Sequence, residues 1–159
     1  MLKTQILQNI IESLEADLSV FASAARAAHE AATNEECQPD NKYDTTALEA
    51  SYIAQGQANR AQEIRVALEN YRTIKMQSFD VDSPVRLTAL VTLEDKDGIQ
   101  RKFFLGPHAG GLKVSAEASE IVVITPQSPL GRNLLGKLTG DEVKSGDNPI
   151  KTYTIVDVC

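Results

Sequence analysis

The feature that most constrains the fold is a stretch from Leu2 to about Thr33 that contains neither proline nor glycine. Its apolar residues recur in steps of three and four, which places them along one side of an α-helix. Seven of the eleven residues from Ala22 to Ala32 are alanine, which favours helix and lets a partner helix approach closely. A long amphipathic helix is therefore predicted, with a stripe made of Leu2, Ile6, Ile10, Leu14, Leu18, Phe21, Ala25, Ala28 and Ala32.

A second helical pattern follows a polar turn that ends near Pro39, a residue that cannot continue a helix. Asp40 or Asn41 is a candidate N-cap for this second helix. Gly56 lies within it, at a cost of roughly 1 kcal/mol relative to alanine, and predicts a close contact or a bend. Two helices joined by a short turn bury their stripes by lying antiparallel. The second stripe is predicted to be Leu48, Tyr52, Ala58, Ala61, Ile64, Leu68 and Tyr71, with the polar Gln55 at the position between Tyr52 and Ala58.

From about Ser78 the apolar period changes to two, which is typical of β-strands. Residues 85–93 alternate, residues 95–98 form a turn, and residues 99–105 resume the alternation, so a β-hairpin is predicted. The predicted fold class is α+β, with an antiparallel α-helical coiled-coil hairpin at 1–76 and a small β-rich domain at 77–159. Further strands are expected at 113–114, 121–124, 141–144 and 153–158, and a short helix at 130–136.

Charge and cysteine content exclude several classes of function. The 159-residue chain has a net charge of −6, with seven Lys and Arg against eleven Asp and Glu before residue 78 and nine against eleven from there on. Neither part carries the clustered cations of a nucleic-acid interface, so any contact with nucleic acid is expected to be indirect, mediated by a metal, or made through another protein. Cys37 and Cys159 lack zinc-site spacing. A cytoplasmic monomer without a membrane segment, resident metal or cofactor is expected.

Acidic residues gather in the turn between the two predicted helices. Glu35, Glu36, Asp40 and Asp44 stand there against a single base, Lys42. Carboxylates at the end of a rigid hairpin can share a divalent cation, because Mg²⁺ takes one or two protein carboxylates and keeps water or phosphate in its other positions. The alternative is a solvated turn whose acids favour the N-terminus of the following helix.

The segment from Ser128 to Asp141 carries the most specific pattern. It resembles the C-terminal domain of the Gre family of bacterial transcript cleavage factors. In that family Ser-Pro is followed by a hydrophobic residue, an unspecified residue, Arg, another unspecified residue, Leu, a second hydrophobic residue and Gly-Lys, and then by Gly-Asp. So long a match is more specific than a short motif. The order of hairpin and β-rich domain, and the chain length, are also similar to that family. The matching residues are Ser128, Pro129, Arg132, Leu134, Gly136, Lys137, Gly140 and Asp141.

The resemblance implies a fold and a partner. The β-rich domain would be FKBP-like and would bind the rim of the secondary channel of RNA polymerase through Gln127, Ser128, Pro129 and Arg132. The hairpin would enter that channel, and the tip acids would assist the polymerase in cleaving backtracked RNA. Asp40 would share the Mg²⁺ of the polymerase rather than bind a metal of its own. The chain would be an accessory factor, not an enzyme, with DNA binding expected only as part of the transcribing complex.

The tip departs from the family pattern. Cys37 stands where the family has its first Asp, Asp40 replaces a Glu, Asn41 is retained, and Tyr43-Asp44 reverses the final pair. Two actions at the same address are therefore open: stimulation of RNA cleavage, or occlusion of the channel in competition with true cleavage factors. A remote alternative from another class is a peptidyl-prolyl isomerase, inferred from the FKBP-like domain alone.

Overall fold

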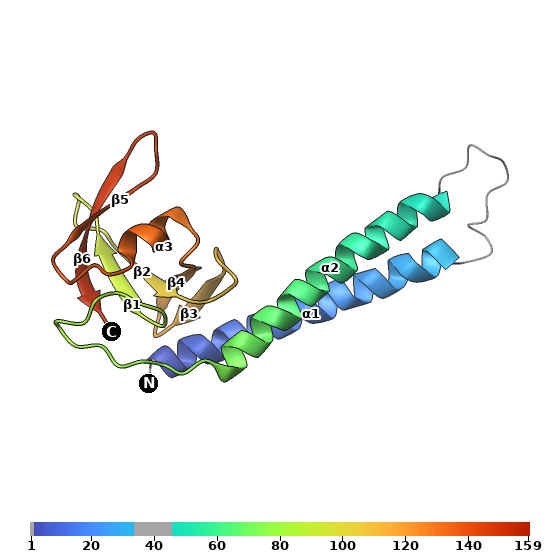
Figure 1. Ribbon diagram of the computed structural model, residues 1–159, viewed down its shortest axis with the longest axis horizontal. Coiled ribbons are helices and arrows are strands. Elements are labelled where there is room, and N and C mark those ends of the chain that lie inside the picture. The colour runs from blue at the N-terminus through green and yellow to red at the C-terminus, as the bar shows by residue number, and fades with distance from the viewer. Residues whose placement is uncertain (1, 34–45) are drawn as a thin grey trace. The chain divides into compact units, whose positions relative to one another are not determined.

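The computed structural model describes residues 2–33 and 46–159 (Figure 1). Two long helices are followed by a six-stranded sheet and one short helix, which confirms the predicted α+β class. No helix among the described residues has the length and apolar character needed to cross a bilayer. The elements are α1 (Leu2–Thr33), α2 (Thr46–Thr73), β1 (Leu90–Glu94), β2 (Gln100–Leu105), β3 (Lys113–Ala116), β4 (Ser119–Ile124), α3 (Pro129–Leu134), β5 (Glu142–Ser145) and β6 (Lys151–Val158).

Contacts divide the chain into two compact units. One, the hairpin unit, comprises Ile11–Glu69, and the other, the β unit, comprises Met1–Ile10 together with Asn70–Cys159. The first turns of α1 and the last turn of α2 therefore count with the sheet. The boundary at residues 76 and 77 that the change of period suggests stays a prediction.

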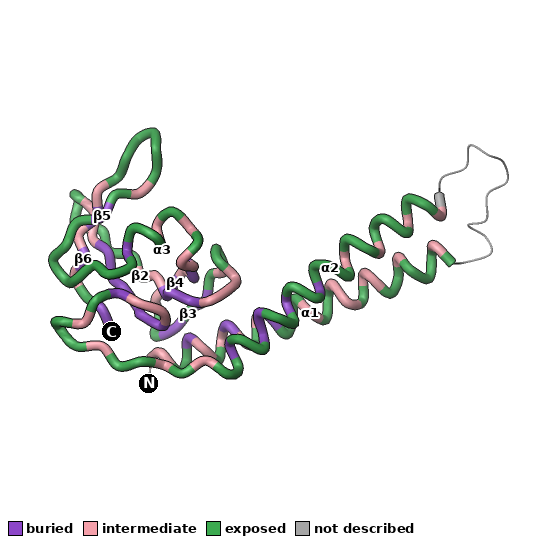
Figure 2. Tube along the Cα trace, in the orientation of Figure 1, coloured by how far each residue is buried: buried purple, intermediate pink, exposed green. Residues whose placement is uncertain are grey.

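In the hairpin unit the two helices run antiparallel (Figure 1), and the stripe predicted for α1 is confirmed. All its members are buried or half-buried. Burial is strongest toward the end of the hairpin where Leu14, Ala61, Ile64 and Leu68 lie, and it weakens toward the other end (Figure 2). The apolar stripes therefore hold that end of the hairpin most firmly.

The stripe predicted for the outer half of α2 is wrong. Leu48 is 52% exposed, Tyr52 is 70% exposed, and Ala58 is exposed too. The half-buried positions there are Ala47, Ala50, Ala54 and Gln57. Small side chains suit a close approach to the alanine-rich part of α1, and the larger Leu and Tyr lie outside. The close contact predicted at Gly56 is also wrong, since a Cβ there would meet nothing within 4 Å.

The sheet of the β unit has the strand order β3-β4-β2-β1-β6-β5. Only β2 and β4 pair in parallel, and the remaining neighbours are antiparallel. The predicted hairpin around residues 95–98 is confirmed, with Leu90 opposite Phe104 and Glu94 opposite Gln100. Gly98 takes a left-handed φ of 79° in its turn, a conformation that glycine adopts without strain.

The strand predicted at 85–93 begins only at Leu90, so the prediction is wrong for residues 85–89. Thr88 has a φ of 73°, outside the range of a strand, and Ala89 N–H donates to the Arg86 carbonyl in a turn at 3.1 Å. The Thr88 hydroxyl accepts a hydrogen bond from the Gln77 amide at 3.0 Å. Alternation alone did not reveal this turn, because Thr88 is buried although its backbone reverses direction.

The segment before that turn is held by an aromatic ring between two cations. The Phe79 ring lies 4.5 Å from Lys3 Nζ and 4.3 Å from Arg86 Cζ, measured to the ring centroid. Arg86 also donates to the Ser78 carbonyl at 3.1 Å. Burial lowers the pKa of Lys3. These cation–π contacts tie the chain between α2 and β1 to the start of α1, inside the β unit.

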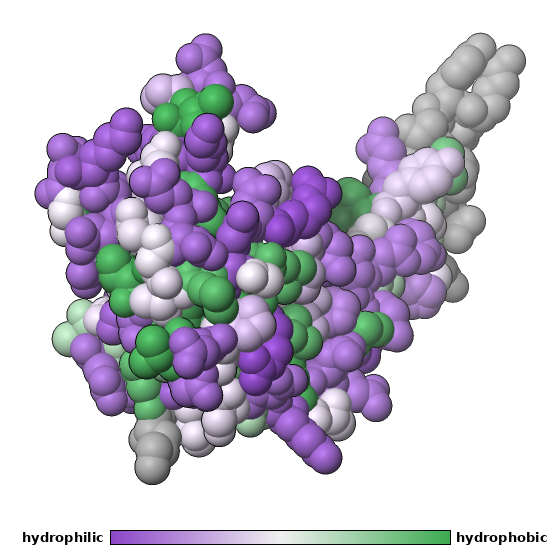
Figure 3. All heavy atoms as spheres, turned by 60° about the vertical axis from the view of Figure 1, so that its left-hand side comes forward, coloured by the Kyte–Doolittle hydropathy of each residue, from purple (hydrophilic) through white to green (hydrophobic). Residues whose placement is uncertain are grey.

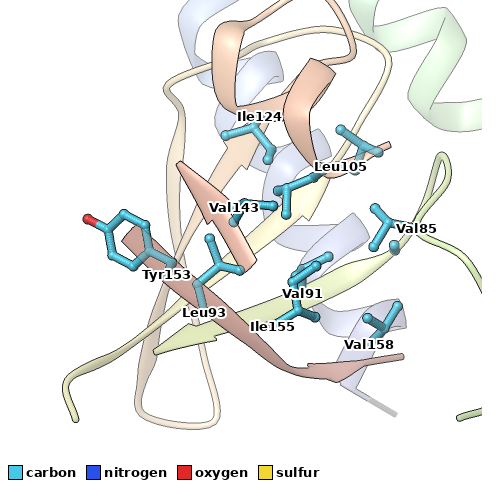
Figure 4. Close-up of a cluster of buried hydrophobic side chains, with 11 residues drawn as sticks. Val85, Val91, Leu93, Leu105, Ile124, Val143, Tyr153, Ile155 and Val158 are labelled. Atoms are coloured by element: carbon cyan, nitrogen blue, oxygen red, sulfur yellow. The ribbon is translucent and has the colours of Figure 1, made fainter. Parts of the chain in front are cut away.

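One face of the sheet is covered by α3 and carries a hydrophobic core cluster of the β unit. Leu134 of α3 is fully buried there, and Figure 4 shows side chains of several strands converging on this core. Two helix residues of the β unit also form hydrogen bonds within it. The Asn9 side-chain amide donates to the Ser115 carbonyl, and the Tyr71 hydroxyl donates to the His108 carbonyl. The cluster comprises Val85, Ala89, Val91, Leu93, Leu105, Ile124, Leu134, Val143, Tyr153, Ile155 and Val158.

Both edge strands are capped by an asparagine side chain. The Asn9 amide donates to the Ser115 carbonyl of β3 at 2.6 Å, and the Asn133 amide donates to the Lys144 carbonyl of β5 at 3.0 Å. Each bond occupies a backbone acceptor that an incoming strand would otherwise use. The edges are thereby made less available for strand addition.

The turn between β3 and β4 predicts a stabilising substitution. Glu117 and Ala118 form a two-residue loop with φ values of 48° and 62°, in which left-handed backbone costs an alanine about 1 kcal/mol relative to glycine. We expect Ala118→Gly to raise the free energy of unfolding by about that amount in a urea titration. Ala116→Gly, in the neighbouring strand, should lower it, and an equal effect of both variants would contradict the turn geometry.

Candidate functional site

The predicted tip acids lie outside the described residues. Glu35, Glu36, Asp40 and Asp44 all fall within 34–45, so their roles stay predictions. The same holds for the N-cap expected at Asp40 or Asn41. Within residues 2–33 and 46–159, no group of three or more His, Cys, Asp or Glu side chains is arranged to hold a metal ion.

The other predicted site forms a tight turn between β4 and α3, which we call the Ser128 turn (residues 125–132). Ser128 is the N-cap of α3, with extended backbone at φ −70° and ψ 152°. Its hydroxyl accepts a hydrogen bond from the Gly131 amide at 3.1 Å and donates one to the Thr125 carbonyl at 2.7 Å. Pro129 follows at the first helical position, where its missing N–H costs nothing. The Ser128 hydroxyl therefore builds the turn.

Gly131 is required by the closeness of the turn to its own helix. A Cβ on this residue would lie 1.9 Å from the Thr125 carbonyl oxygen and 2.8 Å from Ser128 Oγ. No side chain fits that space without moving the backbone. The unspecified position between the hydrophobic residue and Arg in the family pattern is thus filled here by the only residue that has no Cβ.

Other residues of the pattern also form hydrogen bonds that stabilise the fold. Gly136 has a φ of 78° just after the helix, and its N–H donates to the Val85 carbonyl at 2.8 Å. Gly140, with a φ of 95°, donates to the Ile155 carbonyl at 2.7 Å. Asp141 Oδ2 accepts from the Leu138 amide at 2.8 Å. These bonds join the segment after α3 to the sheet and to the chain before β1.

Three of the four residues predicted to bind a partner are exposed on this framework. Gln127, Pro129 and Arg132 are open to solvent, whereas Ser128 is half-buried. Arg132 forms no ion pair and no side-chain hydrogen bond with the described part of the chain. Apolar side chains are dispersed among hydrophilic ones on the face of the β unit that Figure 3 shows. An interface at the Ser128 turn would rely on small apolar contacts, such as Pro129, and on the charge of Arg132.

Two exposed cations near Arg132, namely Lys137 and Lys144, were not predicted from the sequence as site residues. Lys137 follows Gly136, and Lys144 lies on β5, whose Val143 points into the core. The alternation of exposed Glu142, buried Val143 and exposed Lys144 is a signal that could have placed Lys144 on the surface. Its closeness to α3 depends on the Asn133 hydrogen bond, which no local pattern reveals.

A hollow lies on the sheet away from the Ser128 turn, over β2, β4 and β3. The register puts Phe103, Val122 and Lys113 in one row on the same face, with Arg101 and Glu120 beside them. Lys113 and Glu120 form an exposed ion pair at 3.4 Å. Phe103 is the one aromatic residue that lines this described hollow. A mostly polar lining does not suit an apolar proline substrate, so the geometry adds no support to an isomerase.

Comparisons with known proteins give structural likeness only. No protein-family model and no curated protein matches the sequence. Among solved structures, the GreA factor homolog 1 (Gfh1) of Thermus thermophilus is 19% identical, with 94% of each chain covered and a TM-score of 0.39. Thermus aquaticus Gfh1 is 18% identical, with 95% of this chain and 92% of that chain covered and a TM-score of 0.38.

A third structure, the transcription elongation factor GreA/GreB from Nitrosomonas europaea, is 18% identical, with 60% of this chain and 78% of that chain covered and a TM-score of 0.38. The chain is thus similar to solved structures of Gre-type factors.

Proposed function

We propose that the chain is a Gre-like transcription elongation regulator, an accessory factor of the bacterial cytoplasm that binds RNA polymerase as a monomer. The Ser128 turn would contact the rim of the secondary channel, and the helical hairpin would enter it. The tip acids would then stimulate Mg²⁺-dependent cleavage of backtracked RNA by the polymerase. Contact with RNA or DNA would arise only within that complex.

The observation that carries the proposal is that the pattern at 128–141 contains two kinds of residue, those that hold the fold together and those whose side chains make no bond within it. Ser128, Gly131, Leu134, Gly136 and Gly140 make bonds or contacts that the fold itself needs. Arg132 and Lys137 match the family equally well, but their exposed side chains make no hydrogen bond or ion pair within the described residues. A role toward a partner accounts for these two residues.

The hairpin unit is consistent with entry into a narrow channel. The part of α1 that belongs to the hairpin unit runs from residue 11 to residue 33 and has a length of about 35 Å at 1.5 Å per residue. Its outer part is alanine-rich and its partner presents Ala47, Ala50 and Ala54 toward it. Small facing side chains make a slim pair of helices. Slimness and reach are what insertion would require.

The action at the tip has two candidates. Asp40, with Asp44, Glu35 or Glu36, would help to hold the Mg²⁺ of the polymerase and its attacking water, which promotes RNA cleavage. The second candidate arises from Cys37, which stands in place of the first family Asp: the hairpin would occlude the channel and compete with cleavage factors. Both candidates use the same docking surface.

A halted, backtracked elongation complex with Mg²⁺ distinguishes the two actions. We expect the purified chain to shorten the RNA, and Asp40→Ala to abolish this effect while leaving binding intact. Asp17→Ala, which removes an exposed acid of α1, is the matched control and should act like the unchanged chain. Binding with slower elongation and no shortening would establish the competitor instead. A chain that does not bind the polymerase would refute both.

A further inference from the structure

A shallow hollow lies between α3 and the edge strand β5, beside the Ser128 turn. We call it the basic hollow. Three cations and one acid line it, although the whole chain has a net charge of −6. Leu135, which is 40% exposed, provides an apolar surface within it. The residues that matter are Arg132, Asn133, Leu135, Lys137, Glu142 and Lys144.

The cations of the basic hollow are not neutralised by the chain. Arg132, Lys137 and Lys144 are exposed, and none forms an ion pair or a side-chain hydrogen bond with any residue in the described ranges. Glu142 is likewise without an ion pair there. Elsewhere the chain does pair its charges at short range, as in Arg60–Glu63 at 3.0 Å. The hollow therefore presents a local excess of positive charge.

The backbone that carries these cations is fixed by hydrogen bonds. Arg132 N–H donates to the Ser128 carbonyl at 2.9 Å, and the Lys137 carbonyl accepts from the Val85 amide at 2.8 Å. The Lys144 carbonyl accepts from the Asn133 side chain at 3.0 Å. A surface whose backbone is already ordered loses less entropy when a partner binds.

We propose that the basic hollow binds a short acidic segment of a partner protein, with carboxylates at Arg132, Lys137 and Lys144 and an apolar side chain on Leu135. This inference rests on the proposed function and deepens it, because it gives the chemistry of the polymerase surface that the Ser128 turn would meet. Bidentate contact of a carboxylate with the Arg132 guanidinium would give the segment its orientation.

A protein segment fits the basic hollow better than a nucleic acid does. Single-stranded nucleic acids bind on aromatic side chains with cations along the backbone, and in the described part of the chain no aromatic residue lines this hollow. A polyanionic strand would also continue beyond the three cations over a chain that is acidic overall. A short acidic peptide places its charge only where the cations are.

The test titrates a blocked peptide, Asp-Glu-Leu-Asp-Glu, into the full chain at low salt. Binding is followed by the chemical shifts of the backbone amides of the chain. We expect saturable shifts confined to α3, β5 and the residues between them. The double variant Arg132→Glu/Lys144→Glu should weaken binding about tenfold or more, as expected when two attractions become repulsions. The matched control Arg101→Glu/Lys151→Glu makes the same change of net charge outside the hollow and should bind within about twofold of the unchanged chain.

Several outcomes would overturn the proposal. Equal shifts with the neutral peptide Asn-Gln-Leu-Asn-Gln would exclude recognition of carboxylates, and shifts by a short RNA at the same residues but not by the peptide would favour nucleic acid. The same variants are then tested for affinity to RNA polymerase. If Arg132→Glu/Lys144→Glu binds polymerase as tightly as its control, the role proposed for the basic hollow is refuted while the proposed function stands. If even the unchanged chain fails to bind polymerase, the proposed function falls, and the peptide titration alone decides the hollow.

Discussion

Replacing Gly131 with alanine is expected to lower the free energy of unfolding of the β unit by on the order of 3 kcal/mol, at the upper end of what overpacking costs. The new Cβ would lie 1.9 Å from the Thr125 carbonyl oxygen. That oxygen cannot move freely, because it accepts hydrogen bonds from Ser128 Oγ at 2.7 Å and from the Ser128 amide at 3.1 Å. The clash must therefore break the N-cap of α3 and displace Leu134 from the core.

Gly110→Ala is the matched control for this prediction. Its Cβ would also meet Thr125, but at 3.3 Å and against a side-chain methyl group that can shift. We expect a loss below about 1 kcal/mol for Gly110→Ala. Urea titrations followed by circular dichroism measure both variants. If Gly131→Ala is as stable as Gly110→Ala, the described geometry of the Ser128 turn is wrong.

Replacing Tyr71 with alanine is expected to cost about 3–5 kcal/mol, the usual range for a large buried aromatic residue. Tyr71 is fully buried, and its hydroxyl donates to the His108 carbonyl at 2.6 Å. A Cβ on Gly106 would lie 2.1 Å from that hydroxyl, so the ring fills its site completely. Tyr71→Phe keeps the ring and loses the hydrogen bond, at a cost of about 1 kcal/mol.

The same residue makes stability depend on alkaline pH. Burial raises the pKa of Tyr71 well above its ordinary value of 10.0, because the phenolate would be desolvated. The stability that the neutral Tyr71 side chain contributes is fully present at pH values below the pKa of this tyrosine in the unfolded chain. It is lost as pH rises from about 10 toward the folded pKa, since the unfolded chain then releases a proton that the folded chain retains.

We therefore expect the stability difference between the unchanged chain and Tyr71→Phe to shrink, and then to reverse, above about pH 10. Urea titrations at several pH values from 8 to 11 measure it. The comparison cancels the titration of other groups, which both chains share. Parallel curves for the two chains would show that Tyr71 is not buried as described.

Local rules predicted most elements, and they failed where a tertiary contact decided the outcome. The α1 stripe follows from its spacing, because steps of three and four place residues on one helix face whatever they contact. The stripe of the outer half of α2 does not follow from spacing. The small Ala47, Ala50 and Ala54 are half-buried there, while the larger Leu48 and Tyr52 are exposed.

The sheet shows the same limit. The hairpin of β1 and β2 is local and was predicted, but the turn at Thr88 depends on hydrogen bonds to Gln77 and Leu105, which alternation cannot reveal. In the candidate site, Ser128 and Pro129 were recognisable as the start of a helix. The position of Lys144 beside α3 was not, because it depends on a bond between residues eleven apart.

The central claim is that the exposed residues of the Ser128 turn bind RNA polymerase. The most direct measurement is the affinity of the purified chain for core polymerase, compared with the double variant Pro129→Ala/Arg132→Ala. We expect the unchanged chain to bind and the variant, folded by circular dichroism, to bind at least about tenfold more weakly, a loss of about 1.4 kcal/mol. Equal affinities for the two, or no binding by the unchanged chain, would contradict the claim.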